Sequence, residues 1–355
     1  MMEWTRGEII GKGSFSTINL ATPRENSSET PSLMAVKSSS LAQSSMLQRE
    51  EDILSDLSDS PRILRCLGHD TTFEDGEEVY NVFLELASRG NLAELVKSFG
   101  GKMNETLVRH YTKSILQGLC YVHERDYVHC DIKLQNILVC SFDDIKIGDF
   151  GLAKKVGEKK GSGLFGTPLY MSPEAILRNE IETPSDIWAL GCVVVEMITG
   201  KPAWRCGVDA DVSGLLFRIG FSNELPEIPE DISSEGKDFI KRCLVRDPTK
   251  RWTAEMLLNH PFVTDVIVSL TEVEKLYQTP SPKSAFDFPD WTPKSSSYSC
   301  CFEEEMEESD CSSSDFASPA DRIQQLATVK QPNWSYSDTW SIVRQPVSSV
   351  SSYSH

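Results

Sequence analysis

The sequence predicts an α+β protein in which a small strand-rich part precedes a larger helical part and a polar tail. Before about residue 86, short apolar and β-branched runs alternate with turn-forming residues, a pattern typical of strands. After Gly90 the apolar residues recur at helical spacing, for example in Asn104–Glu124 and Pro184–Thr199. Residues 279–355 are rich in Ser and Pro and include the acidic run Glu303–Asp310, so they bury too little apolar surface to offset the entropy cost of ordering.

We therefore expect one domain over residues 4–263 and a largely disordered regulatory tail over residues 264–355. The domain divides into a part from about residue 4 to 86, a connection at 85–90 and a part from about 91 to 263. In the first part, Thr5–Ile10 and Thr17–Thr22 flank a Gly-rich turn and form a hairpin, and Thr22–Ser32 is a loop. The other elements expected there are the strand Leu33–Lys37, the helix Gln43–Leu57 and the strand Val79–Leu86.

Composition and charge disfavour several classes of protein. The formal net charge of -18 makes wrapping around nucleic acid a poor main function. No apolar run reaches the ~18 residues that span a bilayer, and the first residues contain no apolar signal-peptide core. The ten cysteines show no Cys-x-x-Cys pair. We therefore expect reduced thiols in a protein of the cytoplasm or nucleus, rather than a metal site or a disulfide framework.

The strongest functional signal is the stretch His129-Cys130-Asp131-Ile132-Lys133-Leu134-Gln135-Asn136, which Asp149-Phe150-Gly151 follows. Phosphoryl transfer needs a carboxylate that receives the proton of the attacking hydroxyl, and oxygen ligands that hold magnesium over the phosphates. Asp131 fits the first role, and Asn136 and Asp149 fit the second. The apolar alternation of Ile145–Ile147 predicts a strand just before Asp149.

Two weaker signals lie near the N-terminus. The first is Gly11-Lys12-Gly13-Ser14-Phe15-Ser16-Thr17-Ile18, in which glycines would let the backbone approach phosphate oxygens. The second is Lys37, at the end of a short apolar strand. A lysine held against phosphates needs a carboxylate that orients it. Glu50 fits best because Ile53 and Leu54 then fall on the same helix face, and Glu51 is the alternative register.

These motifs, in this order, resemble the signature set of the eukaryotic protein serine/threonine kinases. The resemblance covers about Trp4–Phe262 and includes Gly166-Thr167-Pro168-Leu169-Tyr170-Met171-Ser172-Pro173-Glu174, which is similar to the end of a kinase activation segment. It implies a bilobal protein kinase fold, with a small antiparallel β-rich N-lobe and a larger helical C-lobe, and ATP and Mg²⁺ as cofactors. Lys133 favours serine/threonine specificity, because tyrosine kinases favour Ala or Arg at its position.

The resemblance also implies a role for each matching residue. Lys133 would neutralise charge on the transferred phosphoryl group, and Thr167 would bond to Asp131 and Lys133 and shape the pocket for a substrate Ser or Thr. Glu174 would pair with Arg251, and Asp186 would cap the catalytic-loop backbone, although an ordinary helix N-cap is its alternative. The remaining residues with expected structural roles are His129, whose ring would pack beneath Phe150, and Gly151.

The nucleotide contacts are also implied by the resemblance. Leu84 matches the gatekeeper position, and adenine would bond to backbone groups of Glu85 and Ala87, between Ile18 and Leu138. All expected ATP contacts are Ile10, Gly11, Gly13, Ile18, Ala35, Lys37, Leu84, Glu85, Ala87 and Leu138.

Three positions depart from the family pattern: Ser16 replaces the third glycine, Ser172 replaces an Ala, and Cys130 replaces an Arg. In the family that Arg grips a phosphate on the activation loop, which a cysteine cannot do. Between Gly151 and Gly166 the only hydroxyl is that of Ser162. We therefore hypothesise that activity depends little on activation-loop phosphorylation. The alternative is that Lys155 or its neighbours bind the phosphate instead.

The short N-terminal catalytic domain, the catalytic-loop wording and the Ser-rich tail are similar to those of the plant MEKK-like mitogen-activated protein (MAP) kinase kinase kinases. That resemblance implies MAP kinase kinases as substrates. The alternatives are a pseudokinase-type scaffold, a serine/threonine kinase outside this cascade, and a small-molecule kinase, which the segment from Thr167 to Glu174 disfavours.

The tail contains four Ser/Thr-Pro pairs, which are either targets of proline-directed kinases or incidental pairs in a solvated linker. Asp321–Ala327 could form a short helix on a partner, and Trp334–Val343 is unusually apolar for a linker. Both are candidate docking segments for regulators.

Overall fold

The computed structural model describes residues 3–13, 16–24, 31–141, 144–159, 163–205 and 211–264. The described residues form two compact units. The N-terminal unit lies within 3–51 and 65–86, and the C-terminal unit lies within 52–64 and 87–264. The predicted tail, beyond its first residue, lies outside the described residues, as do Ser162 and the tip of the Gly-rich turn, Ser14–Phe15.

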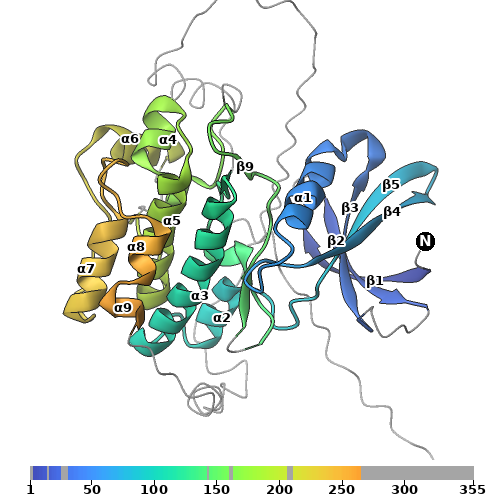
Figure 1. Cartoon of the computed structure of the whole chain (residues 1–355), viewed down its shortest axis with the longest axis horizontal. Coiled ribbons are helices and arrows are strands. Elements are labelled where there is room, and N and C mark those ends of the chain that lie inside the picture. Colours follow the sequence, from blue (N-terminus) through green and yellow to red (C-terminus); the bar gives the residue numbers. More distant parts are fainter. Residues whose placement is uncertain are drawn as a thin grey trace, which may run out of the picture. The chain divides into compact units, whose positions relative to one another are not determined.

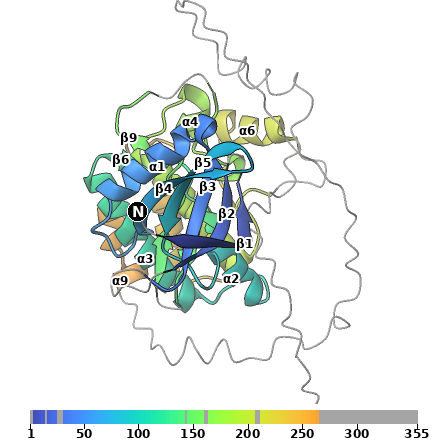
Figure 2. The same ribbon diagram turned by 90° about the vertical axis from the view of Figure 1, so that its right-hand side faces the viewer.

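The N-terminal unit contains a five-stranded antiparallel sheet with strand order β1-β2-β3-β5-β4; Figure 2 shows its five strands. The strands are β1 (Trp4–Lys12), β2 (Thr17–Pro23), β3 (Met34–Ser40), β4 (Cys66–Glu74) and β5 (Glu77–Leu84). The predicted hairpin is formed by β1 and β2, and the N–H of Gly13 donates to the carbonyl of Ser16 at 2.7 Å. A buried cluster on this sheet includes Ala21, Met34, Val36 and Phe83.

One strand of this sheet, β4, was not predicted. Its sequence, Cys66–Glu74, is mostly polar, and its residues alternate between half-buried and exposed because it is an edge strand with only β5 as neighbour. The register shift between Cys66 and Gly68 also interrupts the two-residue alternation of the strand. An edge strand of this kind lacks the apolar run by which the other strands were recognised.

The helix α1 (Ser45–Asp56) follows the 3₁₀ turn η1 (Leu41–Gln43). Its buried apolar residues include Leu47, Ile53 and Leu54. Residues three apart lie on the same side of a helix, so Glu50 falls on this buried face and is only 2% exposed. The face that the helix buries therefore selects Glu50 rather than its neighbour Glu51.

The C-terminal unit is mainly helical, which together with the sheet confirms the predicted α+β class (Figure 1). Its helices are α2 (Leu92–Ser98), α3 (Glu105–Glu124), α4 (Pro173–Arg178), α5 (Thr183–Thr199), α6 (Val212–Phe221), α7 (Ser234–Cys243), α8 (Ala254–Leu258) and α9 (Pro261–Thr264). Its short strands and 3₁₀ turns are β6 (Tyr127–Val128), η2 (Leu134–Asn136), β7 (Ile137–Val139), β8 (Ile145–Ile147), β9 (Lys154–Lys155) and η3 (Pro168–Tyr170).

The helices α3 and α5 form the centre of this unit. The N-cap of α3 is Asn104, whose side chain accepts from the N–H of Leu107. The helix α5 buries almost its whole length, including Trp188, and ends at Gly200 in the left-handed conformation. A Cβ at Gly200 would lie 1.7 Å from the carbonyl oxygen of Gly101, so only glycine fits there.

Two further properties concern the membrane and the thiols. Within the described residues, no helix combines the length and apolar character needed to span a bilayer. The six cysteines in the described part of the chain are free thiols. Burial raises the pKa of the Cys192 and Cys243 thiols, so both stay protonated and unreactive at neutral pH.

Candidate active site

A buried ion pair joins the strand β3 to the helix α1. The Nζ of Lys37 lies 2.6 Å from Oε2 of Glu50, and both residues are more than nine-tenths buried. The alternative partner, Glu51, instead accepts from the Tyr80 hydroxyl and contacts Nδ1 of His69. The structure therefore places the carboxylate of Glu50, not that of Glu51, where it can orient the Lys37 ammonium.

Several predicted nucleotide contacts surround this pair on the sheet. Ile18 lies opposite Lys37 in the β2–β3 register, and Ala35 lies opposite Leu84 in the β3–β5 register. These three apolar side chains are buried. The N–H of Glu85 donates to the carbonyl of Arg65 at 2.9 Å, so a bond from Glu85 to adenine would use its carbonyl.

The other predicted contacts fall at the first hairpin and in the C-terminal unit. Gly11 pairs with Ile18 across the hairpin, Ile10 precedes it, and Gly13 begins the turn. Ala87 and Leu138 belong to the C-terminal unit, where Leu138 lies on β7.

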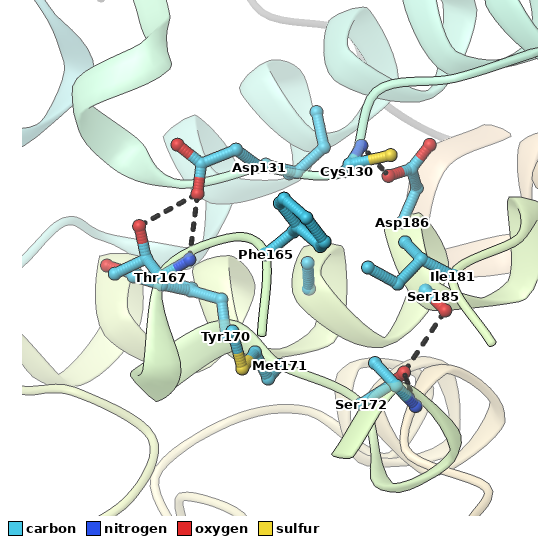
Figure 3. A pocket seen from close by; sticks show the side chains of 13 residues that line it. Cys130, Asp131, Phe165, Thr167, Tyr170, Met171, Ser172, Ile181, Ser185 and Asp186 are labelled. Atoms are coloured by element: carbon cyan, nitrogen blue, oxygen red, sulfur yellow. Dashed lines mark hydrogen bonds between the residues drawn. The ribbon is translucent and has the colours of Figure 1, made fainter. Parts of the chain in front are cut away.

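The predicted catalytic loop lies between β6 and β7. The Oδ1 of Asp131 accepts from the hydroxyl of Thr167 at 2.8 Å and from its backbone N–H at 3.0 Å, as Figure 3 shows. The Nζ of Lys133 lies 2.8 Å from Oδ2 of Asp131 and donates to the Thr167 hydroxyl at 3.1 Å. Two predicted catalytic residues, Lys133 and Thr167, thus bond to the carboxylate of a third, Asp131.

The β7–β8 hairpin brings the two predicted magnesium ligands close together. Ile137 pairs with Ile147, and the N–H of Gly148 donates to the carbonyl of Asn136 at 2.9 Å, so Asn136 and Asp149 sit at adjacent ends of paired strands. Asp149 has a left-handed backbone with φ of 58°, a strained conformation that often occurs at functional sites.

The oxygens of these two residues suit Mg²⁺. The Nδ2 of Asn136 donates to the carbonyl and to Oδ2 of Asp131, whereas its Oδ1 is buried and has no hydrogen-bond partner among the described residues. A buried oxygen without a donor is costly unless a ligand uses it. Mg²⁺ is usually held by one or two protein oxygens together with phosphates and water, which agrees with one amide and one carboxylate here. Within the described residues, no cluster of three His, Cys, Asp or Glu offers a rival metal site.

The carboxylate of Asp186 holds the catalytic-loop backbone from the start of α5. It accepts from the N–H groups of His129 and Cys130, both at 2.9 Å, and from His123 at 3.0 Å. Burial alone would raise the pKa of Asp186, but these hydrogen bonds and the nearby histidines bring the pKa below its usual value. Asp186 is therefore placed as an anchor for the loop, and the simple N-cap alternative does not describe it, because Glu182 occupies the N-cap position.

The ring of His129 packs edge-on against Phe150, with ring centroids 4.7 Å apart, and its Nε2 donates to the carbonyl of Gly148. Both side chains are fully buried. The two contacts of His129 therefore hold Gly148 and Phe150, the residues on either side of Asp149. Gly151 directly follows Phe150.

The end of the predicted activation segment is fixed by a second buried ion pair. Arg251 donates to both carboxylate oxygens of Glu174, at 2.7 and 3.0 Å. Gly166, just before Thr167, has φ of 102°, and a Cβ there would lie 2.8 Å from the carbonyl oxygen of Cys130. Glycine is therefore required to bring Thr167 up to the catalytic loop.

Cys130 also has a left-handed backbone, with φ of 70°, and its thiol lies 3.4 Å from the carbonyl of Val128. It packs with Phe165 against the buried residues Val128, Ala175 and Ile181. A pocket of about 20 Å³, with room for about one water molecule, lies among these side chains (Figure 3). The position that carries Arg in the family is thus part of an apolar cluster here.

Two groups of residues around this segment were not assigned roles from the sequence. Ser172 caps α4 and donates to Ser185, which in turn donates to Glu174. The Ser-Pro pair at a helix start is a recognisable N-cap signal that could have identified Ser172. The hydroxyl of Tyr170 donates to the buried Glu196 at 2.5 Å, and no local pattern signals that contact.

Comparison with known proteins agrees with this geometry. The protein kinase domain family matches residues 4–263. Mitogen-activated protein kinase kinase kinase 20 of Arabidopsis thaliana is 44% identical over 97% of this chain and 100% of its own length. Mitogen-activated protein kinase kinase kinases 17 and 18 of the same plant are 44% and 42% identical, each over 74% of this chain and over 70% and 78% of their own lengths.

The family match covers most of the chain, and the first of these relatives is similar over nearly its whole length. The motifs that the structure brings together around Asp131 are those by which the sequence resembles the kinases. The chain therefore belongs to the protein kinase family, as a serine/threonine protein kinase of the plant MAP kinase kinase kinase type.

Proposed function

We propose that this kinase transfers the terminal phosphate of ATP to Ser or Thr residues on MAP kinase kinases. The names of its relatives support this substrate class. The observation that carries the chemistry is the convergence of Thr167, Lys133 and Asn136 on the carboxylate of Asp131.

Asp131 orients the substrate hydroxyl and accepts its proton as transfer proceeds. Lys133, 2.8 Å from that carboxylate, offsets negative charge that develops on the transferred group. Thr167 bonds to both residues and so couples the peptide-binding segment to the catalytic loop. Lys37, oriented by Glu50, binds phosphate oxygens of the nucleotide.

Asn136 and Asp149 are the proposed magnesium ligands. When bound, Mg²⁺ would neutralise charge on the phosphate oxygens. The role of the chain is to present one amide oxygen and one carboxylate from the adjacent ends of β7 and β8. The unpartnered Oδ1 of Asn136 supports this assignment.

The test is transfer of labelled phosphate from ATP to a panel of MAP kinase kinases that are themselves catalytically inactive. The wild-type chain is expected to label at least one of them on Ser or Thr, and Asp131→Asn is the control. Equal labelling by both proteins would favour a scaffold that recruits another kinase. Labelling of a general substrate but of no MAP kinase kinase would place the enzyme outside this cascade.

We also propose a location in the cytoplasm, the nucleus or both, and regulators that bind the tail. The free thiols of the six described cysteines support a reducing compartment. Imaging of the full-length chain tests the location, and deletion of residues 264–355 followed by partner capture tests the role of the tail.

A further inference from the structure

The start of the activation segment, which runs from Asp149 to Glu174, is tied to the catalytic loop by a short strand pair. In that pair, β9 lies beside β6, with Lys154 opposite Val128 (Figure 2). The side chain of Lys154 is almost fully buried, at 3% exposure. A buried ammonium requires a partner, because an unpaired buried charge costs several kcal/mol. The identity of that partner decides what holds the segment.

The partner is the carboxylate of Glu182. The Nζ of Lys154 lies 2.7 Å from Oε1 of Glu182 and also donates to the carbonyl of Glu158 at 2.8 Å. The backbone N–H of Gly157 points at the same carboxylate, 3.3 and 3.2 Å from its two oxygens. The Glu182 carboxylate, at the start of α5, therefore binds both a lysine and a backbone N–H of the activation segment.

The side chain of Glu182 does not cap its own helix. Glu182 holds the N-cap position of α5, yet its side chain makes no capping hydrogen bond there. Its carboxylate is aimed at the activation segment instead, 28 residues away in sequence for Lys154 and 25 for Gly157. The Lys154 ammonium and the Gly157 N–H are donors of the kind that bind a carboxylate or a phosphate, and here they bind the Glu182 carboxylate.

The Arg that grips an activation-loop phosphate in the family is absent here, and the nearby lysines have other partners. Cys130 replaces the family's Arg and packs in the apolar cluster with Phe165 and Ile181. Lys155 lies over the Tyr127 ring at 3.5 Å and donates to the carbonyl of Arg125. Lys154 is held by Glu182. The arrangement therefore favours a segment fixed by contacts already present in the chain over one that waits for a phosphate.

We propose that Glu182 is a positioning residue, and that its carboxylate, bound to Lys154 and Gly157, holds the activation segment in place without phosphorylation. This inference rests on the proposed kinase function and adds a means of regulation to it. Ile181, next to Glu182, lies in the cluster against which Phe165 packs, so a second part of the segment contacts the chain beside Glu182. Phosphate-independent activity follows from this arrangement, because the Glu182 carboxylate supplies the negative charge that a phosphate would otherwise supply.

The first test compares Glu182→Gln with Glu180→Gln in the full-length chain. Glu180 is a matched control, because it forms an exposed ion pair with Arg178 at 2.7 Å in the same loop. Glu182→Gln is expected to lower kcat by about 10- to 100-fold, since a small displacement of positioned groups can cost that much, with little change in the KM for ATP. Glu180→Gln is expected to behave as wild type.

Hydrogen exchange supplies a readout that does not depend on activity. Glu182→Gln is expected to speed exchange of the Gly157 amide by about tenfold or more, and Glu180→Gln to leave it unchanged, because Glu182 and not Glu180 accepts from that N–H. A lowered melting temperature with unchanged kcat and unchanged Gly157 exchange would mean that Glu182 only stabilises the fold, which would overturn the proposal.

A double-mutant cycle with Lys154→Met decides whether the two residues act together. The variant carrying both changes is expected to lose no more kcat than either single variant. Losses that multiply would show independent effects and contradict the proposal.

Dependence on phosphate is tested on the wild type and on Ser162→Ala, which removes the only hydroxyl between Gly151 and Gly166. Phosphatase-treated wild type and Ser162→Ala are both expected to keep activity within about twofold of untreated wild type. A loss of tenfold or more in either would overturn the proposal. An inactive wild type would instead defeat the proposed function, and the Gly157 exchange would still report on the contact with Glu182.

Discussion

Two buried ionic groups in the C-terminal unit differ in how fully their hydrogen bonds are satisfied. At Arg251, the guanidinium donates to both oxygens of Glu174 and to the carbonyls of Pro184 and Val245. At the catalytic loop, Asp131 is also well bonded, but Oδ1 of Asn136 has no partner among the described residues. Both groups are buried, so the difference does not come from solvent.

On this difference we base the proposal of a structural role for the first group and a catalytic role for the second. A closed network such as that of Glu174 and Arg251 fixes one end of the activation segment and has nothing left to offer a ligand. The catalytic loop keeps a buried oxygen that has no partner among the described residues, and the backbone is left-handed at Cys130 in the loop and at Asp149 after β8. Substitutions in the first group should therefore affect stability, and substitutions in the second should affect activity.

The largest expected effect is on catalysis. Asp131→Asn keeps the shape of the side chain but removes the base, so kcat should fall by about 10²–10⁴-fold. The melting temperature should change less than the activity, because the amide oxygen can still accept from Thr167 while only the bonds from Lys133 and Asn136 are lost. Steady-state kinetics and thermal unfolding of the same preparation check this. If activity fell only because the protein became less stable, the distinction between the two groups would be wrong.

The next effect is on stability. Glu174→Ala leaves the buried Arg251 without its carboxylate and should lower the free energy of unfolding by about 3–5 kcal/mol. Urea denaturation measures this. Glu180→Ala, which removes an exposed ion pair of the same loop, should cost no more than about 1 kcal/mol. Similar losses in both variants would mean that the Glu174–Arg251 pair is not the anchor described above.

A smaller effect is expected for the magnesium requirement. Asn136→Ala removes the unpartnered oxygen, so half-maximal activity should require about tenfold more Mg²⁺, equivalent to about 1.4 kcal/mol of binding free energy. A titration of activity against Mg²⁺ at fixed ATP checks the shift. An unchanged Mg²⁺ requirement would remove Asn136 from the metal site and leave its oxygen unexplained.

The smallest effect concerns Glu196, the buried partner of Tyr170. Burial raises the pKa of Glu196, and the hydrogen bond from Tyr170 only partly opposes this. A carboxyl with a raised pKa in the folded state favours folding at low pH, and this contribution is lost as the pH rises through the folded pKa. At neutral pH the wild type therefore carries a penalty that Glu196→Gln lacks.

Glu196→Gln should raise the melting temperature by a few degrees at pH 8, since 1 kcal/mol corresponds to about 2–4 °C in a domain of this size. The gain should shrink as the pH falls toward about 4.5, where the unfolded chain also protonates Glu. Thermal unfolding across this range is the measurement. A difference that does not vary with pH would show that Glu196 does not titrate in this way.

The sequence predicted the α+β class, the hairpin and the residues around Asp131, because these features depend on local period and on motifs within one loop. The helix α1 was also predicted, but its buried face, and so the selection of Glu50 over Glu51, depends on where the helix packs. The strand β4 was missed because an edge strand carries little apolar signal. The contact of Glu182 with Lys154 could not be predicted, because nothing in either local sequence indicates a partner 28 residues away.

The most direct test of the central claim is calorimetric titration of the folded wild-type chain with ATP in the presence and absence of Mg²⁺. The account predicts saturable binding that strengthens with Mg²⁺, and a loss of this Mg²⁺ effect in Asp149→Ala. Failure of the folded wild type to bind ATP with Mg²⁺ present, or an identical Mg²⁺ effect in Asp149→Ala, would contradict it.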